Sequence, residues 1–216
     1  MSTVEPSATS RSREHTRERL IDAAFEVFAE TGLNAASVEQ ITERAGFTRG
    51  AFYSNFDSKV ELFFAIADAK YTQASAGLQS GVDAILAEAL PAGHPITPDA
   101  VETVVTRVLG LTVADQNWAL FESEFEALAL RDREIAVRYA GHVRTVVSGL
   151  SELLGGALER IGVRFRVPTE QATRLLIASY NAAMRAGVLS GGELSAEALA
   201  DVTALAVLLT ERIPEA

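Results

Sequence analysis

The sequence predicts an all-α protein with an N-terminal helix-turn-helix domain and a larger helical domain. Three observations predict this fold class. Apolar residues recur at helical spacing through most of the chain, and no segment alternates long enough between apolar and polar residues to predict a sheet. Residues 37–59 carry the start and stop signals of short helices joined by a tight turn. With 216 residues, 48% of them hydrophobic, the chain can bury a sizeable core.

The N-terminal segment predicts a tail followed by a first helix. Residues 1–12 are rich in Ser, Thr, Pro and Ala and are expected to form a disordered basic tail. The helix that follows is expected to run to about Glu30 and to end at Gly32. Its core-facing residues form one apolar stripe, which comprises Leu20, Ala24, Val27 and Phe28.

Residues 37–46 predict a second helix with a glycine turn behind it. Ser37 and Gln40 have the spacing of a capping box, in which each side chain accepts a hydrogen bond from the other residue's backbone N–H. Gly46 stands where a helix can end in a left-handed conformation, which glycine adopts without a Cβ clash. The apolar face of this helix comprises Val38, Ile41 and Ala45.

The next helix, from Arg49 to Asn55 with Thr48 as its N-cap, has a face that core packing explains poorly. A step of about 100° per residue directs Ala51 and Phe52 towards the other helices. The opposite arc comprises Arg49, Gly50, Tyr53 and Ser54. A guanidinium can donate to both O6 and N7 of guanine, glycine permits a close backbone approach, and a phenol can donate to phosphate. The arc therefore favours a DNA-reading helix over the alternative, an ordinary helical hairpin with a solvated face.

Asp57 and Ser58 predict the cap of a further helix, whose Lys59 can meet a phosphate together with the amides of that helix end. Taken together, residues from about Arg13 to Asp68 closely resemble the N-terminal domain of the TetR family of transcriptional regulators. The matching features are FAETG at the end of the first helix, the AG turn, the G-x-(F/L)-Y-x-x-F run and the S-K-x-x-L start of the fourth helix. They span about a quarter of the chain, and the remainder resembles the family only in its helical, apolar character and its length.

The resemblance implies a set of DNA-contacting residues and one departure from the family. The implied set comprises Ser37, Thr48, Arg49, Gly50, Tyr53, Ser54, Asn55, Lys59, Arg13 and Arg17. For Arg13 and Arg17 a second interpretation stays open, which is a solvated face paired with Glu14 and Glu18. Glu39 stands where members of the family often offer a neutral or basic group to the DNA backbone. We expect Glu39 to face away from phosphate.

The larger region predicts further helices around one loop. Helix is expected to persist from Lys59 to Leu90, and the segment PAGHPITP, residues 91–98, predicts a loop. The remaining expected helices span Thr97–Ala114, Asp115–Leu130, Asp132–Ile161, Thr169–Leu189 and Ser195–Ile213, with GVRFRVP as a short connector. We expect residues 13–58 to form the helix-turn-helix domain. The resemblance implies an effector-binding and dimerisation domain at 59–216.

Aromatic and polar residues on three of these helices predict a small-molecule site. Its candidate residues are Trp118, Phe121, Glu122, Phe125, Tyr139, His142, Asn181 and Met184. Glu122 and His142 fall on otherwise apolar faces, where a polar group needs a partner or a cavity. An ion pair of Glu122 with Arg107 or Arg138 stays open as the alternative, as does a hydrogen-bonded core role for His142.

The last two helices predict close helix packing. Small residues recur at Ala178, Ala182 and Ala186 on the first of them. The apolar stripe of the second comprises Leu199, Val202, Leu205, Leu209 and Ile213. The resemblance implies that both helices pair with their copies in a homodimer. Such a dimer would set two reading helices about 34–36 Å apart, on the two halves of a palindromic operator.

Composition and charge narrow the function. The chain has no cysteine, which excludes disulfides and thiolate metal sites, and its three histidines lie far apart in sequence, so no metal or cofactor is expected. No nucleophile–base motif or phosphate-binding glycine loop predicts an enzyme. No apolar run approaches about 18 residues, so we expect no membrane segment and a cytoplasmic location.

The net charge of −10 is unusual for a DNA-binding protein, but it is unevenly distributed. Residues 1–60 hold seven Lys or Arg against nine Asp or Glu, whereas the remainder holds twelve against twenty. DNA affinity must therefore come from a local set of Arg and Lys. Together with the resemblance, the sequence implies a ligand-responsive repressor that an apolar effector releases from double-stranded DNA. An effector-independent DNA-binding protein with a filled helical core stays open as the alternative.

Overall fold

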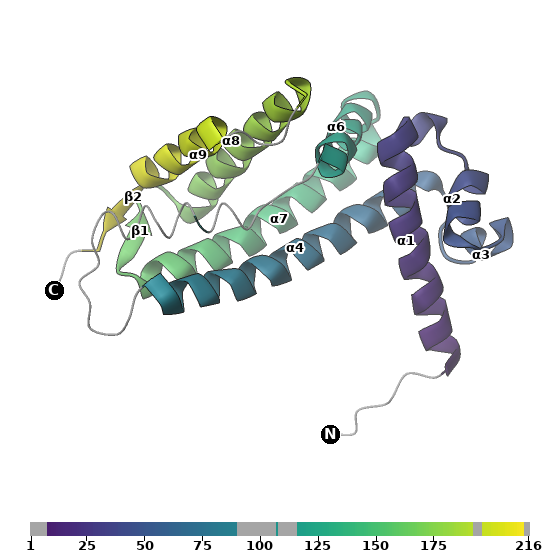
Figure 1. Ribbon diagram of the computed structural model, residues 1–216, viewed down its shortest axis with the longest axis horizontal. Helices are drawn as coiled ribbons and strands as arrows, with labels where there is room; N and C mark the ends of the chain where they lie inside the picture. The colour runs from purple at the N-terminus through teal and green to yellow at the C-terminus, as the bar shows by residue number, and fades with distance from the viewer. Residues whose placement is uncertain (1–7, 90–106, 108–115, 192–195, 214–216) are drawn as a thin grey trace. The chain divides into compact units, whose positions relative to one another are not determined.

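The computed structural model describes residues 8–89, 107, 116–191 and 196–213, and these are predominantly helical (Figure 1). The chain divides into two compact units. Unit 1 comprises Met1–Lys70 and Leu120–Ala127, and unit 2 comprises Tyr71–Ala119 and Leu128–Ala216. Two helices, α4 (Lys59–Ala89) and α6 (Gln116–Arg131), contribute residues to both units. No helix among the described residues is long and apolar enough to span a membrane.

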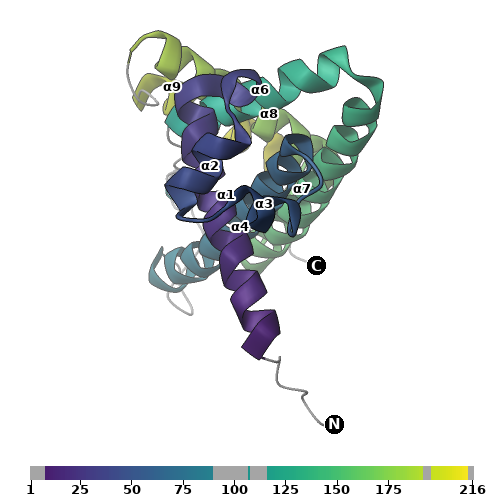
Figure 2. The ribbon, with the colours of Figure 1, turned by 90° about the vertical axis from the view of Figure 1, so that its right-hand side faces the viewer.

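Unit 1 contains the predicted helix-turn-helix. Its elements are α1 (Ala8–Ala35), α2 (Val38–Ala45) and α3 (Arg49–Tyr53), with the unit's parts of α4 and α6. Figure 2 shows α2 and α3 beside α1. The predicted disordered tail is wrong for residues 8–12, which are helical, while residues 1–7 lie outside the described part. The predicted break at Gly32 is present as a left-handed residue (φ 75°, ψ 160°), but helix resumes after it and reaches Ala35.

The core of unit 1 is aromatic. The rings of Phe63 on α4 and Phe121 on α6 stack with centroids 4.0 Å apart. Phe125 packs edge-on against Phe63 and Phe64, at 4.8 and 4.7 Å, and Phe25 of α1 lies 5.7 Å from Phe121. Phe121 and Phe125 are 1% and 2% exposed, so the apolar arc of α6 is filled by protein in this unit.

Unit 2 packs the second part of α4 against α7 (Arg133–Arg160), which lies beside it in Figure 1. The core of this contact comprises Leu78, Val82 and Ile85 from α4 with Leu158, Ile161 and Val163. Helices α8 (Thr169–Leu189) and α9 (Ala196–Leu209) complete the described helices of the unit. α8 packs against both α7 and α9.

A short antiparallel sheet corrects the predicted end of the chain. The predicted helix Ser195–Ile213 ends at Leu209, and β2 (Thr210–Arg212) pairs with β1 (Val163–Phe165) in the predicted connector. Val163 is buried and Arg164 is exposed, which is the alternation of a half-buried strand. Three residues are too few for this alternation to compete with the helical pattern on either side.

The other predicted helices agree closely with the structure. The helix starting at Lys59 is described as far as Ala89, the predicted last residue Leu90 lies outside the described residues, and Thr169–Leu189 has the predicted bounds. The Asp132 carboxylate caps α7 by accepting from the N–H groups of Glu134 and Ile135, at 2.8 and 3.2 Å. The predicted loop at 91–98 and the predicted helix Thr97–Ala114 lie outside the described residues, except Arg107.

Candidate nucleic-acid interface

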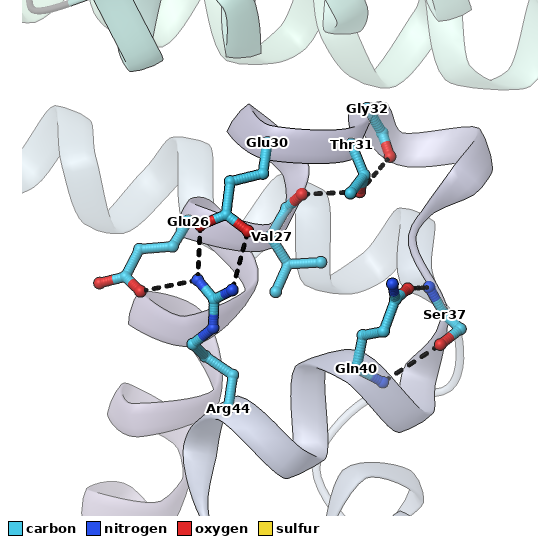
Figure 3. A network of polar contacts seen from close by, with 8 residues as sticks. All are labelled: Glu26, Val27, Glu30, Thr31, Gly32, Ser37, Gln40 and Arg44. Carbon is cyan, nitrogen blue, oxygen red and sulfur yellow. Dashed lines mark hydrogen bonds and ion pairs between the residues drawn. The ribbon is translucent and has the colours of Figure 1, made fainter.

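The capping box predicted at the start of α2 is present in the structure. Ser37 Oγ accepts from the Gln40 N–H at 3.1 Å, and the Ser37 N–H donates to Gln40 Oε1 at 2.8 Å (Figure 3). The helix ends at Gly46, whose φ of 74° and ψ of 32° give the predicted left-handed turn. These two local signals fix the length of α2 and the direction in which the chain enters α3. The Ser37 hydroxyl is used by this cap, and its contact with DNA stays a prediction.

Arg44 joins the exposed side of α2 to α1. Its guanidinium donates to Glu30 at 2.9 and 2.8 Å and to Glu26 at 3.2 Å, as Figure 3 shows. The hydrogen bonds from Arg44 hold the pKa of the Glu30 carboxyl below its ordinary value. Because the two parallel bonds to Glu30 fix the geometry of both partners, this pair helps to set the angle between the helices.

α3 presents the predicted arc to solvent. Thr48 Oγ1 accepts from the Ala51 N–H at 3.4 Å, which caps the helix. Phe52 is 0% exposed and anchors the opposite face. Arg49, Gly50, Tyr53 and Ser54 are exposed. Asn55 is half-buried and donates through Nδ2 to the Ala51 carbonyl at 2.8 Å, so its side chain is engaged within the turn. The contacts of these residues with DNA stay predictions.

Two arginines of α1 bind the C-terminal end of α3. Arg13 Nη2 donates to the Ser54 carbonyl at 3.0 Å, and Arg17 Nη1 donates to the Asn55 carbonyl at 3.2 Å. The guanidinium of Arg17 also lies 4.4 Å from the centroid of the Phe56 ring. Cations at this end satisfy carbonyls that the helix leaves without partners. Sequence reasoning missed this role, which is neither a DNA contact nor a pairing with Glu14 and Glu18.

Lys59, predicted to meet a phosphate, is engaged inside unit 1. Its ammonium donates to the carbonyl of Leu33 near the end of α1 at 2.9 Å and to the carbonyl of Ala36, the residue after α1, at 2.7 Å. An ammonium has three N–H groups, so two of them are occupied here. Ser58 Oγ accepts from the Glu61 N–H at 3.1 Å and caps α4 as predicted. Lys59 thus fixes the N-terminus of α4 to the C-terminal end of α1.

Arg49 has two neighbours on the exposed face. Its Nη1 lies 2.6 Å from Oε1 of Glu39, and its guanidinium carbon lies 6.0 Å from the centroid of the Tyr53 ring. A hydrogen bond with Tyr53 and the charge of Glu39 raise the pKa of Arg49 above its ordinary value. The residue expected to face away from phosphate therefore pairs with the residue expected to read a base.

The predicted small-molecule residues are divided between the units. Phe121, Glu122 and Phe125 belong to unit 1, where the two rings are core. The residues in unit 2 are Trp118, Tyr139, His142, Asn181 and Met184. The rings of His142 and Tyr71 lie 6.3 Å apart, and Met184 is buried. Arg107, one of the two arginines considered for Glu122, pairs with Glu88 at 2.7 Å.

No group of three or more His, Asp or Glu residues that could hold a metal ion occurs within the described ranges.

Comparisons with known proteins match these features. Residues 20–66 match the family described as "Bacterial regulatory proteins, tetR family". The HTH-type transcriptional regulator SrpR of Pseudomonas putida is 47% identical over 58 residues, which are 27% of this chain and 27% of SrpR. The HTH-type transcriptional repressor BepR of Brucella suis biovar 1 is 27% identical over 151 residues, 69% of this chain and 64% of BepR. A solved putative TetR-family transcriptional regulator from Rhodococcus sp. has the same fold, with a TM-score of 0.70, 17% identity, and coverage of 91% of this chain and 98% of that one.

Proposed function

Because the chain belongs to the TetR family of bacterial transcriptional regulators, we propose that it binds a palindromic operator as a homodimer and that a small apolar effector releases it. The observation that carries this proposal is the exposed arc of α3, which is anchored from behind by Phe52. A short helix that presents a guanidinium, a glycine and a phenol on one side suits the major groove of a duplex.

In this proposal the cations of unit 1 have two roles. Arg49 donates to a guanine, Gly50 lets the backbone approach, and Tyr53 donates to a phosphate. Arg13, Arg17 and Lys59 hold α3 and α4 in place through backbone carbonyls and direct their remaining N–H groups to the DNA backbone. The residues that complete the contact with the duplex are Ser37, Thr48, Ser54 and Asn55.

The proposed dimer uses α8 and α9. Leu175 and Leu189 of α8 are 44% and 88% exposed, and Leu208 of α9 is 72% exposed. Ala178, Ala182 and Ala186 are also exposed, so one stripe on the solvent side of α8 is apolar. Apolar residues left in water on two adjacent helices favour a self-complementary interface.

The proposed effector site lies in unit 2, because Phe121 and Phe125 are packed in the core of unit 1. Its candidate residues are Trp118, Tyr139, His142, Asn181 and Met184. An effector that binds one of two states of the dimer better shifts the population towards that state, and α4 supplies residues to both units through which such a shift can act. We infer that it acts as a repressor, the role for which BepR is named.

The alternative is effector-independent DNA binding. The observation that favours it is the filled arc of α6, since an aromatic stripe that could line a cavity is used as core in unit 1. Titration of the DNA complex with a panel of apolar compounds separates the two functions. Release of DNA by one compound, lost in Tyr139→Ala and His142→Ala variants that bind DNA normally, supports the effector-responsive regulator.

The DNA-reading proposal is tested by binding of the full chain to the DNA upstream of its own gene and to duplexes selected from a random pool. Arg49→Ala should weaken binding to the selected site by about 5- to 160-fold, which corresponds to the roughly 1–3 kcal/mol of a bidentate base contact. Arg160→Ala is the matched control, since it also removes a half-exposed arginine of an ion pair, in unit 2. Selection of no preferred duplex would refute the proposal.

The dimer is tested by sedimentation of the full chain. Leu208→Glu should shift the protein towards the monomer because a carboxylate would be buried in the proposed interface. Leu130→Glu changes a leucine that is 83% exposed outside α8 and α9 and should leave the dimer unchanged. A monomeric wild-type protein, or equal behaviour of the two variants, would argue against this interface.

A further inference from the structure

The ion pair between Glu39 and Arg49 lies on the surface that is proposed to read DNA. Arg49 is the first residue of α3, and Glu39 lies in the first turn of α2. The contact between Nη1 and Oε1 is 2.6 Å, although the side chains are 60% and 55% exposed. An exposed pair contributes little to folding stability. Its position instead puts a carboxylate beside the cation that is proposed to enter the groove.

Arg49 keeps donors for DNA while it is paired. A guanidinium has five N–H groups in a planar fork, and the ion pair with Glu39 uses Nη1. The ring centroid of Tyr53, one turn further along α3, lies 6.0 Å from the guanidinium carbon. The side chain is therefore restrained near the exposed arc, and the N–H groups that neither Glu39 nor Tyr53 uses can donate to the O6 and N7 acceptors of a guanine.

We propose that Glu39 determines specificity by keeping Arg49 from DNA phosphates while leaving it able to donate to a guanine. This inference depends on the proposed DNA-binding function. On a duplex without a guanine at that position, no base offers the paired O6 and N7 acceptors, and the phosphate oxygens become the main competing acceptors for Arg49. When Arg49 contacts them, either the ion pair with Glu39 breaks or the Glu39 carboxylate is brought close to phosphates of like charge. Glu39 thus disfavours the non-specific complex more than the specific one, which is discrimination by repulsion.

A general effect of negative charge is the competing explanation, and the chain supplies a control for it. Glu43 lies one turn after Glu39 on α2 and is also exposed. Its carboxylate has no ion pair within the part of the chain that the structure describes. Glu39→Gln and Glu43→Gln therefore remove the same charge from the same helix, and only the first frees Arg49.

The test measures affinities of the full chain for two duplexes over a range of salt concentrations. One duplex is the site that the wild-type protein selects from a random pool, and the other is a scrambled duplex of equal composition. Glu39→Gln should raise affinity for the scrambled duplex about 1.4- to 5-fold, the factor that corresponds to the roughly 0.2–1 kcal/mol of an exposed ion pair. Affinity for the selected site should change less, so the specificity ratio falls. For the scrambled duplex, the plot of log binding constant against log salt concentration should become steeper by about 0.9, because one more phosphate is neutralised.

Glu43→Gln should change both affinities by the same factor and leave the ratio unaltered. In an Arg49→Met background, Glu39→Gln should likewise leave the ratio unaltered, because the cation that it releases is gone. An equal gain on both duplexes for Glu39→Gln would overturn the inference, and so would a loss confined to the selected site, since Glu39 would then contact a base itself. If the wild-type protein selects no site, the proposed function fails and this inference fails with it. If the wild-type protein selects a site but Glu39→Gln leaves the specificity ratio unchanged, only this inference fails.

Discussion

Gly149 on α7 faces the hydroxyl of Tyr71 on α4. This contact predicts that Gly149→Ala lowers the free energy of unfolding when the hydroxyl is present and raises it when the hydroxyl is removed. A Cβ added to Gly149 would overlap the Tyr71 hydroxyl oxygen, whereas the next atom of the ring, Cζ, would lie 3.5 Å away. The hydroxyl lies 3.5 Å from the carbonyls of Thr145 and Val146. An edge contact with the His142 ring at 6.3 Å further restrains the phenol.

Two opposing effects set the expected magnitude. Replacing a glycine inside a helix by alanine stabilises the helix by about 0.8–1.0 kcal/mol. Forcing an extra methyl group into a filled space costs about 1–3 kcal/mol. Gly149→Ala alone should therefore lower the free energy of unfolding by about 0–2 kcal/mol. In a Tyr71→Phe background the overlapping atom is absent and a 3.5 Å contact remains. There the same substitution should raise the free energy of unfolding by about 1 kcal/mol.

Both effects are measured by urea titration of the unchanged chain, the two single variants and the double variant. All four titrations use one protein concentration, because the proposed dimer makes stability concentration-dependent. Gly156→Ala on the same helix is the control, because no atom lies within 4 Å of the added Cβ. It should stabilise by about 1 kcal/mol with either residue at position 71. If Gly149→Ala stabilises the otherwise unchanged chain as much as Gly156→Ala does, the close approach of Tyr71 is refuted.

Three further predictions concern unit 1. Lys59→Met should lower the free energy of unfolding of unit 1 by about 1.5–3 kcal/mol, the value of hydrogen bonds from a charged group. An unchanged melting temperature would argue against the ammonium–carbonyl contacts. Gly46→Ala should cost about 1–2 kcal/mol because an L-residue is strained at this left-handed position, and thermal unfolding checks it. Arg44 lowers the folded-state pKa of Glu30 below the ordinary 4.5, so its contribution is present above that pH and is lost as the pH falls through the folded pKa. Glu30→Gln should therefore lower the urea midpoint at pH 7 and have a smaller effect at pH 3, and an equal effect at both would contradict the pairing with Arg44.

Local signals predicted much of the helix-turn-helix. Ser37 caps α2, Gly46 ends it in a left-handed turn, and Thr48 and Ser58 cap the next two helices. Each signal acts within a few residues, through a side chain and the nearest unpaired N–H or through one backbone angle. Spacing along the chain is therefore enough to locate them. The exposed arc of α3 follows for the same reason, since the period of the helix and the apolar character of Phe52 determine which residues face solvent.

Long-range contacts account for what the sequence did not predict. Arg13 reaches the Ser54 carbonyl across 41 positions, and Lys59 reaches Ala36 across 23. A cation near a motif associated with DNA looks the same in sequence whether it binds a phosphate or a carbonyl. Phe121 and Phe125 present the same difficulty. An aromatic stripe on a helix can be core or can line a cavity, and here the decision depends on Phe63, which lies far away in the chain.

The arrangement of cations in unit 1 also bears on how an acidic chain can recognise DNA. Arg13, Arg17 and Lys59 each donate to backbone carbonyls, and Arg44 donates to two carboxylates. The carboxylates of Glu26 and Glu30 offset the charge of Arg44, the carbonyl contacts occupy N–H groups of the other three cations, and the net charge of −10 weakens the attraction for phosphates further. Non-specific affinity should then be low at physiological salt, because counterion release scales with the number of phosphates neutralised. Base contacts should then supply most of the preference for a specific site, so the proposed placement of Arg49 by Glu39 should matter more here than it would on a strongly basic surface.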